Sequence, residues 1–323
     1  MRIILNDYLQ YCLSRVNITG SMSCFFHAIR TIASYYSSTL IDEVKCAIVM
    51  HALNIKYVEN EYVGYDFFDE ANFDGMEFIQ NQTENDLKFV TRSLSKGFPV
   101  ISFVDSATLT YHNIYKQNRG ELHAVIIYGI DLLRNTLFVY DPHIRINDQN
   151  FDSFHGEIHM SSFTNLGKML AIVKKPYFFN TDIMFTTLTK DLRNFNDCYN
   201  NRGFCALTRL VEDCSKLIIL TKIDEFNEMC MRLNYDIKLN GPCYINNYAI
   251  SISRLFYHPY VEDIALLNRD WINKCNILLY FSQGRIRNLE GTVSDLENLI
   301  KREESLLLRL EDYYGGIING NRL

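Results

Sequence analysis

The residues that could do chemistry in this chain are a cysteine at the start of a helical stretch and, much later, a histidine and an aspartate on apolar runs. In TGSMSCFFHAIRTIASYY, residues 19–36, apolar side chains recur from Phe25 onward with the period of an α-helix. The candidate N-caps are Thr19, Ser21 and Ser23. Cys24 is therefore expected in the first turn, where free N–H groups and the positive dipole end favour the nucleophilic thiolate. A small buried hydrophobe is the alternative interpretation.

A cysteine nucleophile needs a histidine base and a third group that orients the base, and these partners meet in space rather than in sequence. His123 opens the β-rich run ELHAVIIYGID, and Asp141 ends the next run, TLFVYDP. If residues 123–131 and 136–142 form a hairpin, both side chains lie at its open end, with the carboxylate beside the imidazole Nδ1–H. Alone, His123 also fits a core histidine, and Asp141 fits a turn before Pro142.

The other histidines and cysteines offer weaker sites. His27 lies three residues after Cys24 on the same helix face, but the backbone fixes this pair, so we interpret His27 as a packing residue. The sequence HGEIH holds His155 and His159 near His143, yet its glycine and polar surroundings argue against a zinc-protease helix. Short paired spacings typical of structural zinc are absent from Cys198, Cys205 and Cys214. We expect no metal and no cofactor, and we interpret the C-terminal YYGGIING as a frayed tail.

The elements that position these residues fall into two predicted domains. Residues 1–180 alternate helical and β-rich segments, with an irregular stretch over 56–81, whereas residues 181–323 show helical stripes and almost no strand signal. The predicted helices of the first domain are 24–36, 38–53 and 83–97, and its predicted strands are 98–105, 123–131, 136–142 and 167–176. The clearest helix of the second domain has an apolar face of Leu296, Leu299, Ile300, Leu306, Leu307 and Leu310. The predicted fold class is α+β followed by an all-α domain.

Composition excludes several functions. The 323 residues are 48% hydrophobic and 22% charged, and the net charge of -6 argues against nucleic acid as the main partner. We expect no membrane span, because no run approaches 18 apolar residues, and no secretion signal, because MRIILNDYLQ lacks a long apolar segment. None of the nine cysteines forms a C-x-x-C pair, so we interpret them as mostly reduced thiols in a cytoplasmic protein.

Taken in order, four segments resemble papain-like cysteine enzymes: SMSCFFHAIRTIASYY, LSKGFPVISFVDSATLTYH, ELHAVIIYGID and TLFVYDP. Over residues 15–175 the chain is similar to the N-terminal domain of the butirosin-biosynthesis acyltransferase family (BtrH-type), and more distantly to bacteriocin-leader cysteine peptidases. The resemblance implies a papain-like fold, in which a helix carrying the cysteine packs on an antiparallel sheet. It also implies that Cys24 is the nucleophile, His123 the base and Asp141 the orienting acid. The family carries an α-helical second half, which residues 181–323 match in character only.

One family feature is missing from the chain. Papain-like enzymes place a glutamine about six residues before the cysteine as an oxyanion donor, and Ile18 stands there. The backbone N–H of Cys24 would supply the other donor. The residues expected to support the oxyanion or the substrate are Asn17, Ser23, Asp105 and Tyr111.

The resemblance implies acyl transfer through a thioester on Cys24. The donor would be an acyl carrier protein or another thioester, and the acceptor a small amine in natural-product assembly. Two alternatives stay open: a peptidase or amidase, with water as acceptor, and a catalytically decayed binding protein, which the missing glutamine favours. The helical domain would form the acceptor pocket, dock the carrier or make a homodimer. Basic residues suited to an acidic carrier, but also typical of a solvated helix face, are Arg285, Arg287, Lys301 and Arg302.

Overall fold

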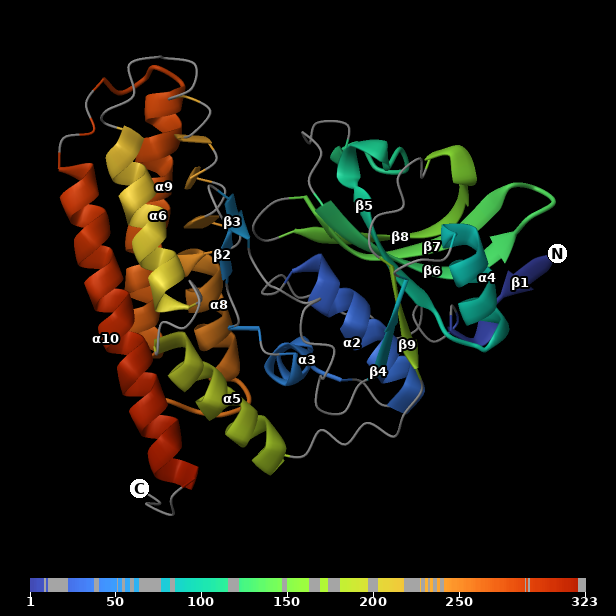
Figure 1. Ribbon diagram of the computed structural model, residues 1–323, viewed down its shortest axis with the longest axis horizontal. Helices are drawn as coiled ribbons and strands as arrows, with labels where there is room; N and C mark the ends of the chain where they lie inside the picture. Colours follow the sequence, from blue (N-terminus) through green and yellow to red (C-terminus); the bar gives the residue numbers. More distant parts are fainter. Residues whose placement is uncertain are drawn as a thin grey trace. The chain divides into compact units, whose positions relative to one another are not determined.

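A computed structural model gives the structure of the chain (Figure 1). It describes residues 1–8, 10, 23–37, 41–50, 52–53, 56–58, 61–63, 77–81, 85–115, 122–146, 150–162, 169–173, 181–196, 203–217, 227, 230–231, 233–234, 237–238, 241–287, 289 and 291–318. The chain divides into two compact units. The first comprises residues 1–47 and 71–179, and the second comprises residues 48–70 and 180–323. Helices and an antiparallel sheet together make the α+β class that the sequence predicts.

The first unit is built on an antiparallel sheet (Figure 1). Within the described residues this sheet has seven strands, in the order β4-β9-β5-β6-β7-β8, with β1 paired to β6 beyond the end of β5. Its strands are β1 (Arg2–Ile4), β4 (Glu77–Gln80), β5 (Val100–Asp105), β6 (Leu122–Asp131), β7 (Thr136–Arg145), β8 (Phe151–His159) and β9 (Met169–Val173). The helical segments are α2 (Cys24–Ser37), α3 (Glu43–Val49), α4 (Asp86–Ser95), η1 (Ser106–Thr108) and η3 (Met160–Ser162).

Helices α2 and α4 cover opposite faces of this sheet. Phe103 of β5 packs on Phe25 of α2, with ring centroids 5.1 Å apart. Its neighbour Val104 instead joins the buried core cluster that contains Phe89 of α4. Because successive side chains of a strand point to opposite faces, α2 and α4 lie on different sides of β5. The sheet is thus buried on both faces where it carries the candidate site.

Strands β6 and β7 form the predicted hairpin. The sequence predicts that β7 ends at Pro142, but the strand continues to Arg145. Between Asp141 and Ile144 the pairing of β7 with β8 shifts register, and β7 holds one extra residue. Proline lacks the N–H that a ladder needs and is tolerated in a strand at such a bulge. The strand therefore passes Pro142, and the bulge redirects the side chains that follow Asp141.

Buried polar contacts fix α2 to the start of α3. The Arg30 guanidinium lies 3.7 Å from the Glu43 carboxylate, and these side chains are only 8% and 4% exposed. The Nε of Arg30 donates a hydrogen bond to the carbonyl of Ile41 (3.1 Å). The Oγ of Ser34 accepts a hydrogen bond from the backbone N–H of Ile41 (2.9 Å). The two opposite charges pair with each other, as burial requires, so these contacts hold the middle and later turns of the helix that carries Cys24.

The second unit is mainly helical, and α9 lies against α10 (Figure 1). Its elements are β2 (Lys56–Val58), β3 (Glu61–Val63), α5 (Thr181–Asn196), α6 (Phe204–Leu217), α8 (Pro242–Ile252), α9 (Val261–Ser282) and α10 (Thr292–Ile318). In the part of the chain that the structure describes, no helix has the length and apolar character needed to span a membrane.

The sequence places all of residues 1–180 in the first domain, but the structure groups residues 48–70 with the second unit. The hairpin of β2 and β3 brings β2 against α6. Leu53 is buried and lines a small cavity with Tyr248 of α8 and Leu310 of α10. These apolar contacts explain why this early segment belongs to the later helices.

The C-terminal glycines also differ from expectation, because α10 continues through Gly315 and Gly316 to Ile318. Tyr314 is 1% exposed, and its hydroxyl donates a hydrogen bond to the carbonyl of Phe256 (2.9 Å). Glycine weakens a helix by about 1 kcal/mol relative to alanine. The buried Tyr314 compensates for this cost, so YYGGII is helical rather than a frayed tail.

Candidate active site

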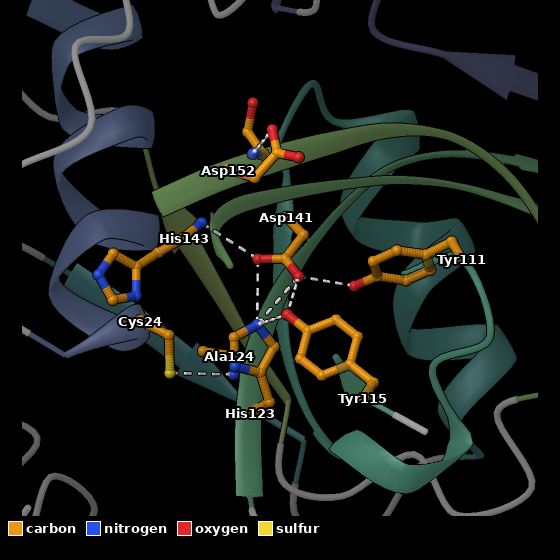
Figure 2. A network of polar contacts seen from close by, with 9 residues as sticks. Cys24, Tyr111, Tyr115, His123, Ala124, Asp141, His143 and Asp152 are labelled. Carbon is orange, nitrogen blue, oxygen red and sulfur yellow. Dashed lines mark hydrogen bonds and ion pairs between the residues drawn. The ribbon is translucent and has the colours of Figure 1, made fainter. Parts of the chain in front are cut away.

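Cys24, His123 and Asp141 come together in the first unit (Figure 2). Cys24 is the first residue of α2, and its Sγ accepts a hydrogen bond of 3.4 Å from the backbone N–H of Ala124. Since Ala124 follows His123 on β6, the thiol lies beside the imidazole. Cys24 is partly exposed, whereas Cys46 is 0% exposed. The interpretation of Cys24 as a small buried hydrophobe does not fit this position.

The imidazole of His123 contacts the carboxylate of Asp141 through Nε2, which lies 3.0 Å from each carboxylate oxygen. The hairpin predicted from the sequence places Nδ1 in this contact, and that expectation is wrong. Figure 2 shows Asp141 and Cys24 on different sides of the ring. With Nε2 engaged by the acid, Nδ1 is the nitrogen left for the thiol. The His123 side chain is 11% exposed and that of Asp141 is 0% exposed, so water has little access to their contact.

The environment stabilises opposite charges on this pair. Burial by itself lowers the pKa of His123, but the charges of Asp141 and Cys24, and side-chain hydrogen bonds with both, raise this pKa well above its ordinary value. Burial raises the pKa of Asp141, but the charge of His123 and hydrogen bonds from His123, Tyr115 and Tyr111 bring this pKa below its ordinary value. The two groups therefore favour an imidazolium beside a carboxylate.

Two tyrosine hydroxyls complete the hydrogen bonding of Asp141. The Tyr115 hydroxyl donates to Oδ2 (2.5 Å), and its oxygen lies 2.9 Å from Nε2 of His123. The Tyr111 hydroxyl donates to the same carboxylate oxygen (2.7 Å), and the backbone N–H of His143 donates to Oδ1 (3.1 Å). These bonds replace water around a buried charge. Sequence reasoning names Tyr111 as a supporting residue but misses Tyr115, which lies four residues later in TYHNIY.

The remaining predicted site residues have different surroundings. The carboxylate of Asp105 accepts a hydrogen bond from the backbone N–H of Ala107 (2.8 Å) and caps η1, and it is exposed to solvent. The Oγ of Ser23 is buried and has no hydrogen-bond partner among the described residues, so its expected side-chain cap is not formed there. Asn17, the proposed oxyanion donor, lies outside the described residues. Of the supporting candidates, Tyr111 alone contacts the triad in the described part of the chain.

The histidines weighed as metal ligands are also placed. His155 and His159 are exposed on β8, a strand that is not among those predicted from the sequence. His143 is buried and stacks on His27 instead. Among the residues that the structure describes, no three His, Cys, Asp or Glu side chains are grouped so that they could hold a metal ion. Cys205 is a free thiol, while Cys198 and the side chain of Cys214 lie outside the described part.

Comparison of the chain with protein-family models and with curated proteins gives no match. The chemistry of the site therefore rests on its geometry. A partly exposed thiol at a helix N-terminus has an imidazole beside it, and a buried carboxylate holds the far nitrogen of that imidazole. This is the arrangement that activates a cysteine for attack on a carbonyl carbon.

Proposed function

We propose that this protein is a cysteine-dependent acyltransferase whose first unit has a papain-like fold, similar in type to the butirosin-biosynthesis (BtrH-type) family. One observation carries the proposal: Cys24 begins a helix beside His123, and Asp141 binds the other side of the same imidazole. The antiparallel sheet with α2 on one face is consistent with a papain-like arrangement.

In the first half-reaction the Cys24 thiolate attacks the carbonyl carbon of an acyl thioester, carried by an acyl carrier protein or a smaller thiol. The C–S bond of the donor breaks, and His123 gives its proton to the leaving thiol. The acyl group is then a thioester on Cys24. Asp141 stays ionised and keeps the imidazole oriented while its charge changes.

In the second half-reaction a small amine attacks the acyl-enzyme. His123 takes a proton from the amine, the new C–N bond forms, and the C–S bond to Cys24 breaks. The product is an amide, and the thiolate is regenerated. Water as acceptor would give a peptidase or amidase, which is the second candidate because the same triad serves both reactions.

The negative oxygen that develops on the acyl group needs hydrogen-bond donors. The backbone N–H of Cys24, at the start of α2, is one donor. We assign Ser23 as the second, because its buried Oγ has no hydrogen-bond partner among the described residues. This hydroxyl belongs to the residue that precedes the nucleophile in the chain, so a donor is available next to Cys24.

The role of the helical unit is also a proposal: acceptor pocket, carrier docking or homodimer contact. Arg302 of α10 forms an ion pair with Asp270 (2.8 Å), and Arg309 pairs with Asp263 (3.1 Å), so both cations are already neutralised. The candidates for contact with an acidic carrier are Arg285, Arg287 and Lys301, all of which are exposed.

The described cysteines are free thiols, which supports a reducing compartment such as the cytoplasm.

The test is acylation of the full chain by an N-acetylcysteamine thioester, followed by intact mass spectrometry and then by a chase with amines or water. We expect a single acyl adduct that is absent from Cys24→Ala, slowed in His123→Ala and discharged to an amide by the amine. Discharge to water alone, with amine present, would show a hydrolase. Cys205 is partly exposed and serves as the control thiol. If no adduct forms and Cys24 reacts with iodoacetamide no faster than Cys205, the protein is not a cysteine enzyme.

A further inference from the structure

A stack of aromatic rings joins the helix that carries Cys24 to the strand that carries Asp141. The ring of His143 lies on the ring of His27, with centroids 4.3 Å apart and planes 9° apart. His143 also stacks with Phe151 of β8, at 4.9 Å and 28°. His27 lies one turn after Cys24 on α2, and His143 lies two residues after Asp141 on β7. The stack therefore connects the two elements that hold the ends of the triad.

The bulge in β7 makes this connection. Residues two apart in a regular strand point to the same face, yet Asp141 contacts Tyr111 and Tyr115 while His143 contacts His27. The extra residue between Asp141 and Ile144 accounts for the difference. Figure 2 shows the two tyrosines on one side of Asp141 and the His143 ring on the other, next to α2.

The contacts of the His143 side chain are made by the faces of its ring. The residue is 6% exposed, and its Nε2 is buried without a hydrogen-bond partner in the part of the chain that the structure describes. Burial and the neighbouring charges of His27 and His123 lower the pKa of His143 to about 2. The ring is thus uncharged at neutral pH, so it lies near the His123 imidazolium without repelling it.

We propose that His143 is a positioning residue, whose ring, stacked on His27, sets the distance between the Cys24 thiol and the His123–Asp141 pair. The inference rests on the proposed function, because it concerns the reactivity of the same thiol. The Arg30–Glu43 ion pair holds α2 further along the helix, and the stack holds the first turns, where Cys24 lies. A small displacement of these turns changes the overlap of thiol and imidazole, on which the rate depends steeply.

Matched variants of the full chain separate the ring from its nitrogens. His143→Ala removes the stack, whereas His143→Phe keeps an aromatic face and removes both nitrogens. The measured quantity is the second-order rate constant for alkylation of Cys24 by iodoacetamide at pH 6. We expect His143→Ala to lower this constant about tenfold or more and His143→Phe to retain it within about twofold. His27→Ala should lower it similarly, and the double variant His27→Ala/His143→Ala should be little worse than either single variant.

Two controls account for effects on folding. His155→Ala removes an exposed histidine of the same sheet and should keep both the rate constant and the melting temperature. Ile130→Val creates a small cavity in the buried core of the sheet, away from the stack, and should lower the melting temperature without lowering the rate constant. A rate loss in His143→Ala that exceeds the loss in Ile130→Val, with rescue by phenylalanine, supports positioning.

The outcomes distinguish this inference from the proposed function. If Cys24 of the unaltered protein reacts no faster than Cys205, the proposed function fails first, and the inference falls with it. If Cys24 is reactive and His143→Ala is equally reactive, positioning by the stack alone is refuted. If His143→Phe folds with an unchanged melting temperature but loses the rate as His143→Ala does, a ring nitrogen is required, and the inference is again wrong.

Discussion

Asp141 is 0% exposed, and its carboxylate accepts hydrogen bonds from two tyrosines, from His123 and from a backbone N–H. Hydrogen bonds to a charged group contribute about 1.5–3 kcal/mol each, and more is lost when a buried charge is left without a donor. The negative charge of Asp141 therefore depends on side chains from a different part of the chain. The tyrosines act on His123 indirectly, since their hydrogen bonds keep its carboxylate partner ionised and in place.

Tyr115→Phe tests this dependence at the residue scale. The variant removes one donor to Asp141 together with the contact to Nε2 of His123, so we expect the alkylation rate of Cys24 to fall about tenfold, the equivalent of about 1.4 kcal/mol. Tyr111→Phe is the matched control, because it removes a donor to the same carboxylate oxygen but no contact with His123. Its effect should be smaller. Equal rates in the two variants and the unaltered protein would contradict the assignment.

The His123–Asp141 pair predicts a pH dependence of stability. The folded pKa of His123 is raised above the ordinary 6.5, so its contribution is complete below about pH 6.5 and is lost as the pH rises through the folded value. The folded pKa of Asp141 is lowered from 3.8, so its contribution is complete above about pH 4 and is lost as the pH falls through the folded value. The pair should stabilise the first unit most between these limits.

The measurement compares the protein with Asp141→Asn at pH 5.5 and at pH 9, using hydrogen exchange of the peptide that covers β6. We expect the difference in opening free energy to be larger at pH 5.5, where the imidazolium is present in the folded state. A difference that does not change with pH would mean that the buried pair is not ionised as the geometry indicates.

Ser23→Ala tests the proposed second oxyanion donor. A donor aimed at the developing negative charge is worth about 3 kcal/mol in the transition state and little before it. The variant should therefore lower the rate of acyl transfer about a hundredfold and leave alkylation by iodoacetamide within about twofold, because alkylation forms no oxyanion. Loss of both rates would point to a structural role for the hydroxyl at the start of α2.

The core of this site is predictable from sequence because two local patterns limit the geometry. A helical stripe starts at Phe25. One β-rich run starts at His123 and the next ends at Asp141, so a hairpin made of these two runs brings His123 and Asp141 together. The identity of the contacting nitrogen is not predictable, since it depends on the direction from which Asp141 approaches the ring. Tyr115 is also beyond prediction, because it follows η1 in a segment without helical or strand periodicity.

At the scale of elements, β8 shows where periodicity fails. Its residues Phe151–His159 are mostly exposed or half-buried, so they lack the apolar run that marks β5, β6 and β7. The strand forms because β7 continues beyond Pro142 and offers its edge. Strand β9, in contrast, has an apolar run, so the strand predicted over 167–176 is confirmed, and it pairs with β5 in the same sheet.

The helices α8, α9 and α10 enclose a carboxylate that should make their packing sensitive to pH. Glu303 of α10 is 1% exposed, and its Oε2 accepts hydrogen bonds from Asn246 of α8 (3.0 Å) and Trp271 of α9 (2.9 Å). Burial raises the pKa of Glu303 from 4.5 to about 7, although these bonds and the charge of Arg302 lower it. The folded state binds this proton more tightly than the unfolded state does. The associated stability is complete below about pH 4.5 and is lost as the pH rises through about 7.

Glu303→Gln should remove this dependence, because the amide stays neutral and keeps an oxygen that can accept both hydrogen bonds. At pH 8 we expect the variant to be more stable than the unaltered protein by up to about 3 kcal/mol, and at pH 5 we expect similar stabilities. Trp271 is the single tryptophan, so urea unfolding followed by its fluorescence reports this unit directly. Glu304→Gln, on the exposed neighbour, is the control and should be neutral. A stability gain that is equal at both pH values would refute the titration of Glu303.

At the scale of the whole molecule, the second unit is discontinuous in sequence, and the first unit is interrupted by residues 48–70. A single boundary near 180 follows naturally from the change from strands to helices, but segment 48–70 has a helix end and short strands that give no sign of their partner. Its assignment depends on long-range apolar contacts such as those of Leu53. Sequence patterns describe local structure, so they do not show such contacts.

This organisation predicts how fragments behave. Residues 180–323 alone lack strand β2, which contacts α6, and Leu53, which lines the cavity by Tyr248, so we expect this fragment to be poorly folded by circular dichroism and Trp271 emission. The same fragment with residues 48–70 fused through a flexible linker should regain helical content and a blue-shifted emission. Equal folding of both fragments would show that residues 48–70 are dispensable for the helical unit.

Segment 48–70 also has a consequence for synthesis on the ribosome. It emerges before the helices that bury its apolar side chains, and elongation adds only about 5–20 residues per second. Ile48, Ala52 and Leu53, each 3% exposed or less in the folded chain, have none of those helices to cover them during that interval. The nascent chain therefore exposes the apolar side chains of this segment until those helices are made, and we expect a holding chaperone to bind there during that interval.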